Sequence, residues 1–343
     1  MHRGRPSRGL PHARSEPPRP KESAISLAPP IRARQSFRHE AILWRDRDEY
    51  AETLIGFIGD GLEAGEPVMV ATTAEHEAWL RSGLAESAGD VAFADITEIG
   101  RNPARLIPTW QKFLDGVGRD RPARGVGEPI WPGRRAAEIT ESQLHEALVN
   151  LAVDPETPFW LVCPYDVGGL DAGVIDEVSR SHPVLIEDHG YHGSARYGGR
   201  AHIEALLGAE FDQPPGTPAE TTYRPAGLGH VHEVVLDEAA AAGLAAADAR
   251  ALATSCQRLA AGSLHRGAAC GRLRIWDVED AVICELADET RLSDPLAGRR
   301  APLTTDRDGL WFVNQNSDLV RLRVNGSGTA VRIYAWKDGP GSQ

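Results

Sequence analysis

The sequence predicts an α/β domain with a parallel sheet covered by helices on both faces, followed by a smaller α+β sandwich. Between residues 37 and 186, short apolar runs alternate with segments of helical periodicity, which is typical of such a sheet. After residue 228, two helical segments precede strand-like runs, the order expected of an α+β sandwich. The predicted units are a disordered basic arm at 1–36, a first domain at 37–186, a linker at 187–227, a second domain at 228–337 and a tail at 338–343.

The first domain opens on the apolar segment FRHEAILW at 37–44, and the helix that follows is expected to end at Gly65. The continuous apolar run PVMVAT comes next and is typical of a strand buried on both faces. The same alternation then repeats along the chain. The expected helices are YAETLIGFIGDGLEAGE, HEAWLRSGLAES, PARLIPTWQKFLDGV, ITESQLHEALVNLAV and GVIDEVSRS, and the other expected strands are VAFADI, ARGVGEPIW, PFWLVCPYDV and HPVLIED.

Gly, Pro, Ser and Thr dominate residues 187–227, apart from the short helical segment HIEALLGAEF, and this composition predicts a flexible linker. In the second domain, HVHEVVLDEAAAAGL and AADARALATSCQRLAAGSLHRG are expected helices, and DRDGLWFVNQNSD contains a short one. GRLRIWDV and AVICELAD are an expected strand pair, and LVRLRVNGSGTAVRIYAW is an expected hairpin that turns at Asn325-Gly326-Ser327-Gly328.

The composition argues against several classes of protein. The net charge is -12, from 37 basic and 49 acidic side chains, so a nucleic-acid partner is not expected. The arm at 1–36 differs, with eight basic side chains, two acidic ones and seven prolines, a composition typical of disorder. No apolar run approaches the roughly 18–20 residues of a membrane span, and no signal peptide is evident, so we expect no membrane partner and a cytoplasmic location. The four cysteines have no CxxC spacing, which predicts reduced thiols.

Six segments of the first domain, taken together, resemble the MEDS sensory domain of bacterial regulators. They are FRHEAILW, GLEAGEPVMVAT, GRNPARLIPTW, GVGEPIWPGR, LHEALVNLA and FWLVCPYD. The resemblance implies a RecA-like core and a role in sensing small hydrocarbon derivatives. The phosphate-binding motif GxxxxGK[ST] does not occur in the sequence, so a nucleotide site of that type is not predicted.

The ends of two expected strands in the segment from Arg124 to Gly169 carry the most varied polar and aromatic side chains of the chain. Because ligands bind where parallel strands end, we predict a pocket there for a small, largely apolar effector. Glu128 lies between Gly127 and Pro129, and the polarity of its side chain is the hardest to explain by packing alone. The predicted ligand-sensing residues are His39, Glu128, Trp131, His145, Cys163, Tyr165 and Asp166.

Each of these residues also has a structural interpretation. His145 lies at the edge of the buried face of its expected helix, and Glu146 is expected to point away from that face. Cys163 is expected to be a small buried side chain rather than a nucleophile, and the aromatic residues suit core packing. His39, His145, Cys163 and Asp166 have the residue types of a metal site, but four separate elements would have to converge. Six further histidines surround the linker without consistent spacing, so no metal is predicted: His182, His189, His192, His202, His230 and His232.

The second domain resembles the histidine-kinase-like ATPase fold, in particular the anti-sigma regulatory kinases of actinobacteria. The segments LRIW, DPLAGRR and GLWFVNQNSDLVRLR carry this resemblance. It implies ATP and Mg²⁺ as cofactors, and a sigma factor or an anti-sigma antagonist as the protein partner. The family's catalytic Asn-Glu-x-x-x-Asn motif falls on Gln257, Arg258 and Gly262. Arginine cannot accept a proton and glycine has no side-chain oxygen for the metal.

Two glycine motifs of that family are also altered. The adenine-contacting Asp-x-Gly falls on Asp288-Glu289-Thr290, and the phosphate-side glycines fall on Asp306-Arg307-Asp308-Gly309. Two carboxylates beside a triphosphate repel it by about 4 kcal/mol per charge pair at 4 Å with an effective dielectric near 20, although Arg307 offsets part of this. We therefore expect catalysis to be lost. The vestigial nucleotide-binding set is Gln257, Arg258, Gly262, Asp288, Thr290 and Gly309.

Two classes of function follow. The first is a signalling protein whose sensor domain reports to a degenerate anti-sigma-like module, and the second is an active ATP-dependent serine/threonine kinase. The lost motifs favour the first class. An enzyme centred on the sensor pocket has no recognised nucleophile and base spacing. The linker is too long and too rich in Gly and Pro to transmit a rigid push. We therefore expect the sensor domain to control the second domain by docking on it or through a change in dimerisation. The sequence leaves open whether the chain forms a homodimer.

Overall fold

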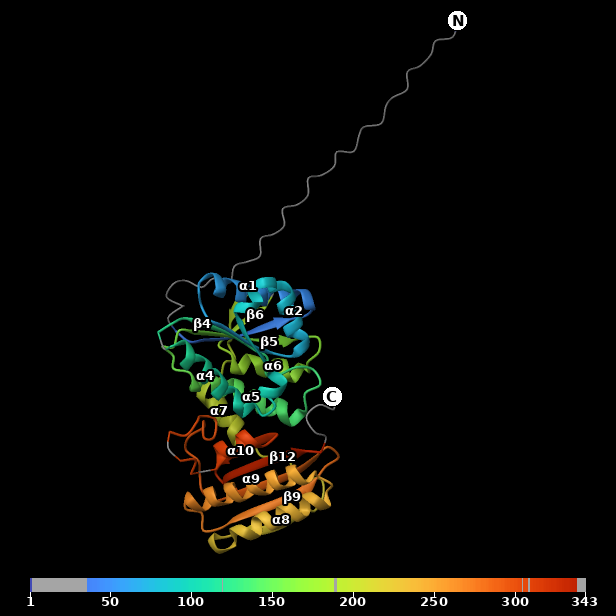
Figure 1. Ribbon diagram of the computed structural model, residues 1–343, viewed down its shortest axis with the longest axis vertical. Helices are drawn as coiled ribbons and strands as arrows, with labels where there is room; N and C mark the ends of the chain where they lie inside the picture. The colour runs from blue at the N-terminus through green and yellow to red at the C-terminus, as the bar shows by residue number, and fades with distance from the viewer. Residues whose placement is uncertain (2–35, 119, 188–189, 304, 308, 338–343) are drawn as a thin grey trace.

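The computed structural model describes residues 1, 36–118, 120–187, 190–303, 305–307 and 309–337. Within them the chain forms two separate sheets, each with its own helices, drawn one above the other in Figure 1. The predicted basic arm, apart from Met1 and Ser36, and the predicted tail lie outside the described residues. None of the helices in the described part combines the length and the hydropathy that a bilayer span requires.

The first sheet is parallel except at one edge. Its strands follow the order β3-β2-β4-β5-β1-β6-β7, and only the pairing of β7 with β6 is antiparallel among those of the described residues. The predicted parallel α/β fold is therefore confirmed. The strands are β1 (Arg38–Trp44), β2 (Val68–Thr72), β3 (Val91–Asp95), β4 (Ala123–Gly127), β5 (Phe159–Asp166), β6 (Val184–Glu187) and β7 (Gly190–Gly193).

Helices cover both faces of this sheet because successive side chains of a strand point to opposite sides. From β1, Ile42 and Trp44 pack with α1 and α2 on one face, whereas Ala41 and Leu43 pack with α4, α5 and α6 on the other. The helices are α1 (Arg47–Glu63), α2 (Ala74–Leu84), α3 (Ile96–Ile99), α4 (Leu106–Val117), α5 (Ala136–Ala152) and α6 (Ala172–Ser181), with 3-10 turns at Ala85–Asp90 and Pro103–Arg105.

The first helix begins at an acidic turn. Asp46 accepts hydrogen bonds from the backbone N–H groups of Asp48 and Glu49, each at 3.0 Å. In nucleotide-binding α/β folds, the turn after a strand offers N–H groups of this kind to a phosphate. Here Asp46 occupies them and two further carboxylates add negative charge. This geometry agrees with the missing phosphate-binding motif.

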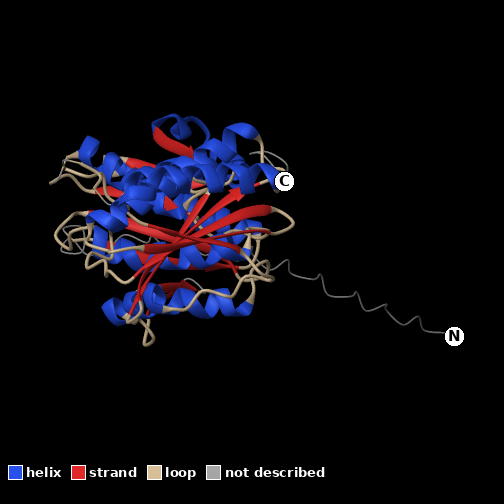
Figure 2. Ribbon diagram, turned by 90° about the horizontal axis from the view of Figure 1, so that it is seen from below, coloured by secondary structure: helices blue, strands red, loops and turns tan. Residues whose placement is uncertain are grey.

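The second sheet is antiparallel, with strand order β11-β12-β10-β9-β8, and helices α8 and α9 pack on one of its faces. The predicted antiparallel sheet in the C-terminal part is confirmed, and in Figure 2 the strands lie between layers of helices. The elements are β8 (Ala219–Tyr223), a 3-10 turn at Pro225–Gly227, α8 (Leu228–Ala241), α9 (Ala246–His265), β9 (Gly271–Asp277), β10 (Ala281–Asp288), α10 (Leu310–Asn316), β11 (Leu319–Asn325) and β12 (Gly328–Trp336).

The segment at 187–227 differs from the flexible linker that its composition predicted. It contains β7, the expected short helix as α7 (Gly199–Gly208), and β8, which pairs with β9 as part of the second sheet. Between α7 and β8, Phe211 is buried on that sheet. The guanidinium groups of Arg321 and Arg332 lie 5.2 and 4.5 Å from the centre of its ring. Cation–π contacts and ring burial hold this stretch in place, and composition alone could not show them.

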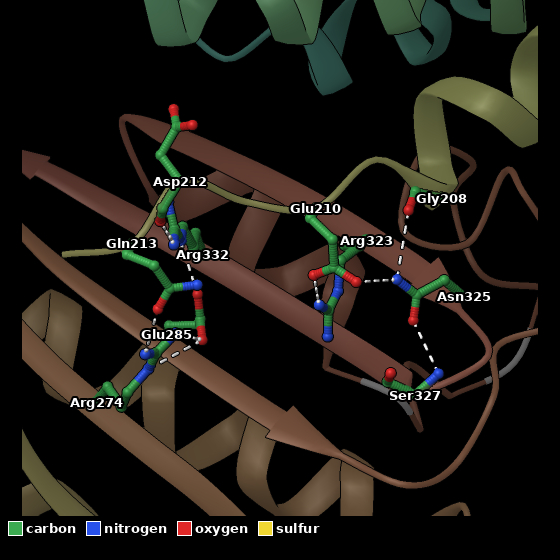
Figure 3. Close-up of polar contacts among 10 residues, drawn as sticks. All are labelled: Gly208, Glu210, Asp212, Gln213, Arg274, Glu285, Arg323, Asn325, Ser327 and Arg332. Atoms are coloured by element: carbon green, nitrogen blue, oxygen red, sulfur yellow. Dashed lines mark hydrogen bonds and ion pairs between the residues drawn. The ribbon is translucent and has the colours of Figure 1, made fainter.

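Polar contacts of Glu210 and Asp212, the residues before and after Phe211 in the sequence, also hold this stretch (Figure 3). Glu210 pairs with Arg323 and accepts a hydrogen bond from the Asn325 amide at 2.7 Å. The backbone carbonyl of Asp212 accepts a hydrogen bond from Arg332. The connection between the two domains is therefore bound to the face of the second sheet that lies opposite α8 and α9.

A buried ion network lies beneath this stretch. Glu285 of β10 accepts hydrogen bonds from Arg332 at 2.7 Å and from Arg274 at 2.5 Å. Burial alone would raise the pKa of Glu285, but the two guanidinium groups hold that pKa below its usual range. The carboxylate is therefore charged at neutral pH, and its two partners join β9, β10 and β12 across the sheet.

The first domain packs directly on the second through α5, α7 and the turn before α4. We call this contact the docking interface. The buried Arg299 pairs with the buried Glu141 of α5, and Arg105 donates hydrogen bonds to the carbonyls of Asn314 and Ser317 at 2.9 and 2.7 Å. Apolar side chains from α5 and α7 belong to the same buried cluster as α9 and β11; they are Leu144, Ala147, Leu148, Ala152, Ile203 and Leu207.

Candidate functional site

The predicted pocket residues lie on opposite faces of the first sheet. His39, Cys163 and Tyr165 point toward α5 and α6, together with Ala41 and Leu43. Glu128 points toward α1 and α2, where it meets His76 of α2. The reason is the alternation of side chains along each strand. The structure therefore brings some predicted residues together but does not place all of them around one pocket.

Two predicted residues, Asp166 and Trp131, lie at the end of a strand and in a loop, respectively. Asp166, at the end of β5, accepts hydrogen bonds from the N–H groups of Gly168 and Gly169, each at 2.9 Å, and so orders the turn that follows. Trp131 is half-buried, with the guanidinium of Arg134 lying 4.2 Å from the centre of its ring. Both residues therefore make structural contacts, the interpretation that the sequence allowed beside a ligand-binding role.

Four buried side chains converge on the α5 and α6 face. We call them the histidine cluster: His39 of β1, Glu146 of α5, Cys163 of β5 and His182, which follows α6. Their nearest ligand atoms all lie within 4.8 Å of one another. Glu146 Oε2 is 2.8 Å from His182 Nε2 and 3.2 Å from His39 Nε2, and Cys163 Sγ is 3.4 Å from His39 Nε2.

The prediction that Glu146 points away from the buried face of its helix was wrong, because α5 is buried on more than one side. Only 2 % of the residue is exposed, because α5 is covered by the sheet on one side and by the second domain on another. Its neighbour His145 lies 3.8 Å from the Glu146 carboxylate, and burial lowers the pKa of His145 to about 4.

Burial sets the charges inside the histidine cluster. Burial, followed by the charge of His182, lowers the pKa of His39, while burial and then the Glu146 charge raise the pKa of the Cys163 thiol. Burial would also raise the pKa of Glu146, but His182 and His39 hold it well below its usual range. At neutral pH the site therefore contains a carboxylate, a neutral His39 ring and a thiol.

A second group of polar and aromatic side chains lies at the carboxyl ends of the parallel strands. In this Glu128 cluster, the buried Glu128 carboxylate accepts from the Thr72 hydroxyl and lies 2.8 Å from His76 Nδ1. Tyr50 of α1 completes it, 3.1 Å from Thr72 Oγ1. Ring contacts extend the group to Trp44, 5.1 Å from Tyr50, and to Trp79, 4.5 Å from His76 between ring centres.

The sequence alone identified Glu128 but not its partners. Thr72 ends an apolar strand and His76 lies in the first turn of a helix, two positions where polar side chains are common and carry no signal by themselves. The same holds for His182, which the sequence associated with the linker. The strand topology does indicate where polar side chains gather, because β1, β2 and β4 are parallel and their carboxyl ends lie at one edge of the sheet.

In the second domain, the residues at the predicted catalytic positions, Gln257, Arg258 and Gly262, contact other parts of that domain rather than one another. The Arg258 guanidinium lies 4.1 Å from the centre of the Phe312 ring. A side chain at Gly309 would meet the Arg258 carbonyl at 2.8 Å, so α10 begins directly against α9. Gln257 donates to the Leu228 carbonyl at 3.2 Å. Gly262 is buried within α9.

The retained aspartate has partners of its own. Asp288 pairs with Arg266 at 3.0 Å and accepts a hydrogen bond from the Thr290 N–H at 2.7 Å. Asp306 accepts hydrogen bonds from the backbone N–H groups at the start of α10, including that of Phe312 at 2.7 Å. Asp308 lies outside the described residues.

Residues 38–183 match the family model MEDS, the methanogen/methylotroph, DcmR sensory domain. This match confirms the resemblance found for the first domain and indicates a role in sensing for that part of the chain. The resemblance of the second domain to anti-sigma regulatory kinases stays a prediction. A comparison with curated proteins gave no match.

Proposed function

We propose that the chain is a regulatory protein in which the MEDS domain senses a small molecule and controls a C-terminal module that acts by protein contact. The module is proposed to have lost phosphotransfer and to bind a sigma factor or an anti-sigma antagonist. The sensory family match supports the first half of this proposal. The residues at the predicted catalytic and adenine-binding positions, and their contacts with Phe312, Leu228 and Arg266, support the second half.

The proposed loss of catalysis rests on the side chains at the positions where the resemblance places a catalytic base and an adenine-binding carboxylate, because these side chains already have partners within the module. Arg258 stands where the catalytic base is required and stacks on Phe312. The Asp288 carboxylate, which would meet the adenine amino group, is already paired with Arg266. Binding a nucleotide there would require breaking a partly buried charge pair, which costs stability because the separated charges lose their compensation.

The absence of phosphotransfer is directly testable. When the full chain is incubated with labelled ATP, Mg²⁺ and candidate antagonist proteins, we expect no incorporation of phosphate above the level seen without the chain. An active kinase of the same family serves as the positive control for each substrate. Steady incorporation that disappears in Asp288→Ala would establish the kinase alternative instead.

The Glu128 cluster is the proposed effector site. It lies at the carboxyl ends of β2 and β4, where ligands bind in α/β sheets. Its aromatic side chains from α1 and α2 suit a small, largely apolar molecule, and the Glu128 carboxylate and His76 ring supply the few polar groups that such sites carry.

A thermal-shift screen of small alcohols, amines and related organic molecules tests this site. A ligand that binds only the folded state adds about 2.7 kcal/mol of stability at 100 times its dissociation constant. We expect Glu128→Gln to abolish the shift and His145→Gln, on the opposite face of the sheet, to retain it. If the shift survives Glu128→Gln and is lost in His145→Gln, the effector binds on the α5 face.

Control of the module is proposed to operate through the docking interface. An effector can change the partner's access only if it binds the docked and the undocked states with different affinities. Helix α5 is positioned for such coupling because its residues contact both the first sheet and the second domain. The packed connection at 209–213 limits how far the two domains can separate.

A further inference from the structure

The side chains of the histidine cluster present four donor atoms of the types that bind zinc and related ions. Two imidazole nitrogens, a thiol sulfur and a carboxylate oxygen come together from four elements of the first domain. In a tetrahedral site with metal–ligand bonds of about 2.0–2.3 Å, neighbouring donor atoms are roughly 3.3–3.8 Å apart. The contacts of 2.8, 3.2 and 3.4 Å require only small side-chain shifts to accommodate an ion.

The other nitrogen of each ring is already engaged. His182 Nδ1 lies 3.0 Å from the Val178 carbonyl, which can only accept, so Nδ1 carries the hydrogen. His39 Nδ1 lies 3.1 Å from Asn150 Oδ1. The Asn150 amide nitrogen donates to backbone carbonyls, including that of Ser181 at 2.9 Å, so its oxygen is the acceptor. Histidine ligands of metals are usually oriented by a second hydrogen bond of this kind.

In neutral rings, these bonds leave a lone pair on each Nε2, and both Nε2 atoms lie beside the Glu146 carboxylate. His182 Nε2 and Glu146 Oε2 are 2.8 Å apart, yet neither atom makes an aligned hydrogen bond. Buried polar atoms normally have such partners. While both neighbouring rings are neutral, a carboxylate in a site shielded from water lacks a compensating positive charge. A metal cation supplies that charge and satisfies all four donor atoms at once.

We propose that His39, Glu146, Cys163 and His182 bind one ion of the zinc class, through Nε2, a carboxylate oxygen, Sγ and Nε2 respectively. The sulfur and nitrogen donors favour zinc and its transition-metal neighbours over calcium or magnesium. Four protein ligands in a buried site are typical of a structural or regulatory ion, because no position is left for substrate. As the sulfur–metal bond forms, the Cys163 thiol releases its proton to the buffer.

The Glu128 cluster provides an internal comparison. There too a buried carboxylate faces a histidine, but Glu128 accepts a hydrogen bond from Thr72 and lies in hydrogen-bonding geometry with His76. No second imidazole or thiol joins it among the groups of metal-ligand type in the described residues. A buried His–Glu pair is thus not sufficient for the proposed site, and His76→Ala is the matched control for His182→Ala.

The first experiment uses the full chain, purified under reducing conditions and stripped with a chelator. Titration with Zn²⁺ in competition with a chromophoric chelator is expected to show one tightly bound ion per chain and the release of one proton from Cys163. Titration with Co²⁺ is expected to give tetrahedral cobalt bands and a thiolate-to-cobalt charge-transfer band. If the stripped wild type binds no stoichiometric ion and shows no such band, the proposal is wrong.

Substitutions of single residues test which side chains bind the ion. Cys163→Ser is expected to remove the charge-transfer band, whereas Cys270→Ser, in the second domain, keeps it. His182→Ala is expected to lose the ion, whereas His76→Ala retains it. Asn150→Ala leaves all four ligands in place and is expected to weaken binding about 10- to 100-fold, as is usual for a group that orients a ligand. A band that persists in Cys163→Ser would overturn the assignment, even if a histidine variant fails to fold.

Discussion

Arg299→Ala is expected to destabilise the chain by about 3–5 kcal/mol, because it leaves the Glu141 carboxylate buried without the arginine that faces it. Only 2 % of either residue is exposed. Burial already raises the pKa of Glu141, and the guanidinium of Arg299 opposes that rise. Chemical denaturation at neutral pH measures the loss, and small-angle scattering would show whether the two domains separate.

The neighbouring Arg300 is the matched control. Its side chain is exposed and donates to the Ala152 carbonyl at 3.1 Å, so Arg300→Ala is expected to cost less than about 1 kcal/mol. Replacing both members of the buried pair by methionine should recover much of the stability, since neither charge is then left alone. Equal effects of Arg299→Ala and Arg300→Ala would contradict the importance assigned to the buried pair.

Arg299→Ala also tests the proposed control of the module by the sensor domain. If docking limits access to the partner surface, Arg299→Ala should raise the affinity for a sigma factor or antagonist and make that affinity independent of the effector. The wild type should respond to the effector. Unchanged affinities in both proteins, with and without effector, would show that the two domains act independently.

Gly328→Ala is expected to cost about 3 kcal/mol. The φ angle of Gly328 is +114°, a conformation that is essentially restricted to glycine. A Cβ atom there would also lie 2.0 Å from the Asp288 carbonyl, which belongs to the backbone and cannot rotate away. The substitution therefore has to move the start of β12 away from the end of β10. Thermal or denaturant unfolding of the full chain measures this loss.

Gly326, two residues earlier in the same hairpin turn, is the control. It has no positive φ, and an added Cβ would have no atom within 4 Å. Gly326→Ala is therefore expected to change stability by less than about 1 kcal/mol in either direction. If Gly326→Ala proves as destabilising as Gly328→Ala, the close approach of β12 to Asp288 is not what makes glycine necessary.

Local patterns predicted most elements of both domains. PVMVAT could be recognised as a strand because it is apolar throughout, and a strand of a parallel sheet buries both faces. The Asn325-Gly326-Ser327-Gly328 turn could be recognised because glycine allows the backbone angles of a tight hairpin. Strand β8 could not, since AETTY alternates weakly and forms a strand only because β9 lies beside it.

The sequence by itself determined the order of most elements, the parallel sheet of the first domain and the place of Glu128 at a strand end, because periodicity and turn chemistry act between near neighbours. Only the tertiary structure decided which polar residues meet. Glu146 and His182 join His39 and Cys163 because four elements fold onto one face of the sheet, whereas Glu128 projects to the other face. Strand direction and helix packing determine which side chains come into contact, and the composition of a single segment shows neither.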